Sequence, residues 1–98
     1  MHYPSLDEYL DHCVSLRRSS GTLDDGVTAK FIPVGNRVEC LFYRNGRVSR
    51  PIVVVSESAL NFTLTVDGMN PISFVKVGTS AIDNCQWLLS DILRLSGL

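Results

Sequence analysis

The residues with the most reactive side chains stand side by side near the start of the chain. His12 and Cys13 are adjacent, and an imidazole beside a thiol is the pair that cysteine enzymes use for nucleophilic attack. The stretch is helical in pattern, however, and neighbours on a helix point about 100° apart. Cys13 falls on the apolar stripe, so we expect a buried thiol beside a surface imidazole. No acid, base and nucleophile come together elsewhere in the sequence, and we expect no enzyme activity.

Carboxylates on the same helix are the other candidates for chemistry. Asp7 and Asp11 share one helix face, and Glu8 and His12 share the next. Such pairs hold a hard cation only loosely, and no loop of closely spaced oxygen ligands follows them. The sequence also lacks the glycine-rich motifs that cradle phosphate groups. We therefore expect a solvated helix face, with neither a metal nor a cofactor.

Arginines gather in the middle of the chain. The formal net charge is −1, yet the segment from Lys30 to Arg50 holds five basic residues and one acid, Glu39. Two of the arginines flank Asn45-Gly46, a strong signal for a tight hairpin turn. A β-ribbon with arginines at its tip suits phosphate and guanine, although the aromatic pattern of RNA-binding sheets is missing. Nucleic-acid binding is therefore the alternative function, with the candidate residues Arg37, Arg44, Arg47 and Arg50.

Two helices are predicted at the ends of the chain, which at 98 residues is long enough for one domain with a modest core. Ser5-Leu6-Asp7-Glu8 is a capping box, and apolar residues at helical spacing predict a helix over Leu6–Arg17. A wide apolar stripe predicts a second helix that begins after Ser80, its N-cap, and stops at Gly97.

Between the helices the apolar pattern changes to a period of two residues, which is typical of strands. The alternation is clearest over Leu60–Val66, and tight-turn residues separate the strand-like stretches. The sequence therefore predicts an α+β fold, a five-stranded antiparallel meander with an N-terminal and a C-terminal helix packed on one face. The predicted strands are Val27–Val34, Arg37–Arg44, Arg47–Val55, Leu60–Val66 and Pro71–Val77.

Pairing across the hairpin turns predicts which residues face the helices, because residues directly opposite share a face. The turn at Asn45-Gly46 sets Val38 against Val53, and the last turn sets Phe62 against Val75. The predicted inner face is nearly all apolar. It comprises Val27, Ala29, Phe31, Val38, Cys40, Phe42, Val53, Val55, Leu60, Phe62, Leu64, Val66, Val75 and Val77.

The opposite, outer face carries the leading functional hypothesis. Half of its residues are apolar, whereas one side of an antiparallel sheet that faces water should be polar. Contiguous exposed apolar surface marks partner sites, and Tyr, Trp and Arg dominate interface energetics. We expect a non-enzymatic protein-binding module, working as a homodimer, an inhibitor or an adaptor, unless a helix or the loop after the first helix covers this face. The predicted interface residues are Leu41, Tyr43, Arg50, Ile52, Phe74 and Trp87.

Trp87 is expected on the side of the last helix that points away from the sheet. A tryptophan there leaves a large apolar area exposed unless something covers it. Packing against a chain end such as Tyr3-Pro4 is one explanation, and anchoring a partner is the other, which we favour.

The order of helix, meander and helix, with Leu23-Asp24-Asp25-Gly26-Val27 at the first strand, resembles that of small type III secretion chaperones. The resemblance implies a small secretion-type chaperone as a second alternative function. Members of that family have a further helix in the middle of the sheet, for which Ser56–Ala59 is too short. The resemblance therefore assigns no site residue.

The cysteines and the chain start bear on the compartment. Cys13, Cys40 and Cys85 are odd in number, far apart and without a Cys-x-x-Cys motif, which predicts buried free thiols rather than disulfides or a zinc site. The first residues lack the basic and apolar regions of a signal peptide, and no apolar run is long enough to span a bilayer. We expect a cytoplasmic protein without a membrane partner.

Overall fold

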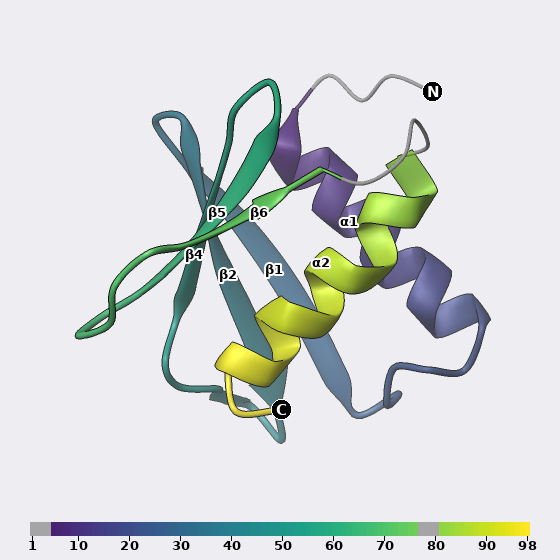
Figure 1. The fold of residues 1–98 in the computed structure, drawn as a ribbon. Coiled ribbons are helices and arrows are strands. Elements are labelled where there is room, and N and C mark those ends of the chain that lie inside the picture. The colour runs from purple at the N-terminus through teal and green to yellow at the C-terminus, as the bar shows by residue number, and fades with distance from the viewer. Residues whose placement is uncertain (1–4, 77–80) are drawn as a thin grey trace.

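Two helices and one antiparallel sheet make up the protein, as described by a computed structural model for residues 5–76 and 81–98 (Figure 1). Both helices pack against the same face of the sheet, so the predicted α+β fold is confirmed. The elements are α1 (Leu6–Ser19), β1 (Val27–Val34), β2 (Arg37–Arg44), β3 (Arg47–Val48), β4 (Val53–Glu57), β5 (Asn61–Val66), β6 (Ile72–Val75) and α2 (Ala81–Leu95). The predictions for Tyr3-Pro4, Val77 and Ser80 lie outside the described residues.

Both helices stop at glycines in the left-handed conformation, and for the second helix this confirms the predicted stop at Gly97. The φ angle is 74° at Gly21 after α1 and 86° at Gly97 after α2. In each case two backbone hydrogen bonds close the last turn in the Schellman pattern. They run from Thr22 to Arg17 and from Gly21 to Arg18 after α1, and from Leu98 to Leu93 and from Gly97 to Arg94 after α2. The predicted capping box is wrong, because no side-chain hydrogen bond caps α1 at Ser5.

The strands follow one another across the sheet in the order β1-β2-β4-β5-β6, with the short β3 paired to β2. Phe31 lies opposite Cys40 across the first hairpin, as predicted. Asn45 and Gly46 have φ angles of 54° and 76°, the left-handed pair that a type I′ turn requires. The sequence signals at the first two turns therefore give the observed register.

The predicted third strand is interrupted. Ser49–Ile52 leaves the ladder between β3 and β4, and it contains Pro51, which has no N–H to donate to a neighbouring strand. When pairing resumes, Val38 lies opposite Val55 instead of the predicted Val53. A shift of two residues keeps every side chain on its predicted face, so the inner face of β4 is unaffected.

The last hairpin slips by one residue, and this slip reverses the predicted faces of β6. A β-turn over Val66–Met69, with Gly68 at a φ of 80°, makes the loop one residue shorter than predicted. Phe62 therefore lies opposite Phe74 and not Val75. Phe74, predicted on the outer face, lies on the inner face together with Ile72, while Val75 is 67% exposed. Leu60, also predicted inside, is 71% exposed at the end of the sheet.

The core lies between the helices and the inner face. Leu10 of α1 and Leu88, Leu89 and Ile92 of α2 are fully buried. Full burial of such a side chain stabilises the fold by roughly 1.5–3 kcal/mol. The sheet contributes the predicted inner residues Val27, Phe31, Val38, Cys40, Phe42, Val53, Val55, Phe62, Leu64 and Val66.

A disulfide joins the two helices, and the prediction of three free thiols is wrong for two of them. Cys13 of α1 and Cys85 of α2 are bonded, with their Cα atoms 5.3 Å apart and a separation of 72 positions in sequence. Only Cys40, buried on β2, is a free cysteine. The bond forms because the apolar stripes of both helices face the same core, which brings their cysteines together.

Reduction of this disulfide should lower the free energy of unfolding by about 4 kcal/mol, because closing so long a loop restricts the unfolded chain. Urea denaturation of the oxidised and the dithiothreitol-treated protein measures the difference on identical side chains. The Cys13→Ala/Cys85→Ala protein is the control, and its stability should not respond to the reductant. Equal stability of the oxidised and reduced wild type would contradict the prediction.

Candidate functional site

The outer face of the sheet has no described element over it. Both helices lie on the other side (Figure 1), and within residues 5–76 and 81–98 no helix or strand crosses the outer face. Five large side chains of its strands are partly exposed there and form what we call the outer patch. These are Ile32, Leu41, Tyr43, Val48 and Val54.

Strand register makes the outer patch contiguous. Glu39 lies opposite Ile32 on one side and opposite Val54 on the other. Tyr43 lies opposite Val48 on β3. Side chains directly opposite on neighbouring strands are in contact range, so the patch runs across β1, β2, β3 and β4.

Two opposite charges lie within this surface. Lys30 is opposite Leu41, which places it diagonally from Glu39 on the same face. Neither side chain takes part in an ion pair in the described part of the chain. The surface therefore holds apolar side chains on both sides of Glu39, together with the cations Lys30 and Arg37, and none of these three charges is in an ion pair among the described residues.

The predicted interface residues separate into two groups. Leu41 and Tyr43 belong to the outer patch, and Ile52 and Arg50 lie in the Ser49–Ile52 segment beside it, partly exposed and exposed, respectively. Phe74 lies on the inner face, so its predicted place on the outer face is wrong. Trp87 was predicted on the side of the last helix that points away from the sheet, and this is also wrong, because its ring lies against Phe74 and Phe62.

Trp87 is part of an aromatic cluster between α2 and the sheet. Its ring centroid lies 5.1 Å from that of Phe74 and 6.0 Å from that of Phe62. Tyr9 of α1 stacks against Phe62, with the ring centroids 6.1 Å apart. The indole Nε1 is buried and has no hydrogen-bond partner among the described residues. Trp87 therefore packs against the core, which neither of the two predicted explanations had proposed.

The four arginines of the nucleic-acid hypothesis do not form one group. Arg44 and Arg47 face each other at one end of β2, and Arg50 follows nearby in the chain. Arg37 begins β2 and lies at its other end. Arg44 also pairs with Asp24 at 3.5 Å. Three of the arginines are thus near one end of the sheet, and one of these is partly neutralised.

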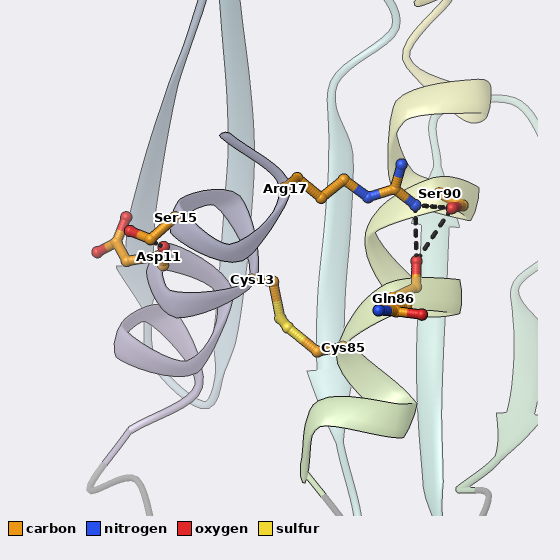
Figure 2. Close-up of a disulfide and its surroundings, with 7 residues drawn as sticks. All are labelled: Asp11, Cys13, Ser15, Arg17, Cys85, Gln86 and Ser90. Carbon is orange, nitrogen blue, oxygen red and sulfur yellow. Dashed lines mark hydrogen bonds between the residues drawn. A yellow bond between two sulfur atoms is a disulfide. The ribbon is translucent and has the colours of Figure 1, made fainter. Parts of the chain in front are cut away.

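The disulfide and its surroundings are a site that the sequence analysis missed. Figure 2 shows Arg17 extending from α1 to α2, one helical turn beyond the disulfide. Its guanidinium donates to the main-chain carbonyl of Gln86 at 2.9 Å and to the hydroxyl of Ser90. The available signal was that Cys13 and Cys85 each lie on the buried stripe of a helix, and both helices were expected on one face.

The remaining candidates for chemistry are isolated. Partial burial, and to a lesser extent the nearby Asp7 carboxylate, raise the pKa of Asp11. The described residues contain no group of three His, Cys, Asp or Glu side chains placed to hold a metal. Burial raises the pKa of the Cys40 thiol to about 12, which keeps it protonated and unreactive at neutral pH.

Comparison with known proteins finds no matching family model, no matching curated protein and no matching solved structure. Neither helix, within the residues described, is long and apolar enough to cross a membrane.

Trp87→Ala should lower the free energy of unfolding by about 3–5 kcal/mol, because it removes a large aromatic side chain from a packed cluster. Trp87→Phe keeps part of the ring contact and should cost less. Urea denaturation measures both, and the wild-type tryptophan emission should be blue-shifted and resistant to iodide quenching. Unchanged stability of Trp87→Ala with a red, easily quenched wild-type spectrum would contradict this placement.

Proposed function

We propose that this protein is a non-enzymatic protein-binding module that pairs with a second copy of itself through the outer patch. The observation that carries the proposal is the one-sided placement of the helices, which leaves five large side chains partly exposed on a sheet face that would be polar if it met only water. Contiguous apolar surface of this kind on a small protein is typical of a partner site.

The charges favour a second copy as the partner. In a two-fold symmetric dimer the same surface meets itself, so each residue contacts its counterpart's neighbours reciprocally. Lys30 of one copy can then pair with Glu39 of the other, twice per dimer. A foreign partner, as expected for an inhibitor or adaptor, needs its own complementary charges, whereas this chain already carries both signs on one face.

The two alternative functions have weaker support. Nucleic-acid binding would use Arg37, Arg44, Arg47 and Arg50, but Arg37 lies at the far end of β2 and Arg44 pairs with Asp24. A small secretion-type chaperone would have a further helix within the sheet, whereas Ser58–Leu60 alone connects β4 and β5. Both alternatives therefore rank below self-association.

The disulfide changes the cellular compartment that we expect for this protein. The sequence predicts a cytoplasmic protein, yet disulfides form and persist mainly in oxidising compartments. The Cys13–Cys85 bond favours such a compartment over the cytoplasm. Alkylation of thiols in intact cells before lysis reports which state the protein has in its host.

Tyr43→Asp should convert a dimer into a folded monomer, because an unpaired charge in an apolar interface is costly. Sedimentation velocity at micromolar concentration measures the change, and circular dichroism checks that the fold is kept. Ser15→Asp is the matched control, since Ser15 lies exposed on α1, on the other side of the sheet from the outer patch. A wild type that stays monomeric at high concentration would contradict self-association and leave a foreign partner for the patch.

The charged pair gives a second arm of the same experiment. Glu39→Lys alone should weaken the dimer, because two lysines then meet across the two-fold axis. Adding Lys30→Glu restores opposite charges and should restore most of the association. If the double variant is as weak as Glu39→Lys, the proposed pairing of the two surfaces is wrong.

A further inference from the structure

A hollow lies beside the disulfide between α1, the loop that follows it and α2, and each of the bonded cysteines in its wall is 1% exposed. Its volume is about 470 Å³. Both bonded cysteines line it, together with Leu16, Arg17, Ser20, Thr22 and Gln86. The hollow is large enough for a molecule of several heavy atoms, since one water occupies about 30 Å³ of liquid.

The wall of this hollow carries a positive charge that no carboxylate in the described chain neutralises. The two partners of the Arg17 guanidinium, a main-chain carbonyl and a hydroxyl, are both uncharged. None of the ion pairs of the described residues includes Arg17. Its Nε is buried without a hydrogen-bond partner among those residues. A carboxylate is the group that a guanidinium binds best in such a setting.

We propose that the hollow admits a small thiol that carries a carboxylate, and that this thiol exchanges with the Cys13–Cys85 disulfide. The carboxylate lies against Arg17, which holds the thiol near the disulfide. The thiolate sulfur attacks one cysteine sulfur, a mixed disulfide forms, and the other cysteine leaves as a thiolate that takes up a proton. A second thiolate then attacks the mixed disulfide, which releases the oxidised thiol dimer and leaves both cysteines reduced.

This site is distinct from the outer patch, so the proposed thiol exchange and the proposed dimer can be tested independently. Its consequence concerns the helix layer: exchange removes the only covalent tie between α1 and α2 in the described chain. The stability of that layer then depends on the small thiols around the protein.

The test compares the rates at which three thiols reduce the wild-type disulfide, followed by alkylation and mass spectrometry. The thiols are anionic 3-mercaptopropionate, neutral 2-mercaptoethanol and cationic cysteamine. Each rate is divided by the fraction of that thiol that is ionised. It is then divided by the rate at which the same thiol reduces a neutral reference disulfide. The anionic thiol should then be faster than the cationic one by about tenfold at low salt, with the neutral thiol between them. High salt should reduce the ratio.

Arg17→Met should bring that ratio close to one. Arg18→Met is the matched control and should leave the ratio unchanged, because Arg18 binds the Val27 carbonyl and does not line the hollow. Gln86→Glu keeps the main-chain carbonyl that Arg17 binds and adds a negative charge, so it should lower the ratio even if Arg17→Met fails to fold. A mixed disulfide with 3-mercaptopropionate should be trapped by acid during the reaction.

Two results would overturn the proposal. One is a charge preference that is absent in the wild type or identical in the wild type and Gln86→Glu. The other is a reduction rate that does not rise with thiol concentration, which means that the disulfide is reached only after the protein opens.

Discussion

The packing of α1 and α2 side by side on one face of the sheet determines where the other features of this protein lie. Leu10 of α1 and Leu88, Leu89 and Ile92 of α2 are fully buried by this arrangement. The disulfide between Cys13 and Cys85 and the reach of Arg17 to α2 join the helices directly. Because both helices pack against the inner face, neither covers the outer face.

The two faces of the sheet consequently differ in what they can do. On the inner face even the edge strand is covered, since Phe74 of β6 meets Trp87 of α2. On the outer face large apolar residues remain partly exposed beside Lys30 and Glu39. The inner face and the two helices on it form the core that stabilises the fold. The outer face is the surface that is available for binding a partner.

Local patterns in the sequence determined much of the fold. Alternation of apolar and polar residues placed the inner residues of β1, β2, β4 and β5, and Asn45-Gly46 set its turn, because both signals act between near neighbours in the chain. The interruption at Pro51 left the predicted faces of β4 unchanged, because a shift of two residues keeps every side chain on the same side of the sheet. The outer patch was predictable for the same reason, and Leu41 and Tyr43 lie where the pattern put them.

The errors arose where the structure depends on a single residue in a turn or on a contact between residues far apart in the sequence. The turn at Gly68 shortened the last loop by one residue and thereby moved Phe74 to the inner face. Cysteine spacing along the chain does not report distance in space, so the bond between Cys13 and Cys85 was missed. Trp87 was misplaced because only the apolar stripe of α2 was expected to touch the sheet, whereas Trp87 also contacts Phe62 and Phe74.

Intermolecular contacts measured by isotope-filtered NOE spectroscopy test the central claim most directly. Methyl-labelled and unlabelled protein are mixed, so that signals between labelled and unlabelled protons come only from two different copies. A dimer joined through the outer patch gives such signals from the methyl groups of Ile32, Leu41 and Val54, and none from Leu88 or Leu89. Intermolecular signals only from helix residues, or none at millimolar concentration, would contradict pairing through this face.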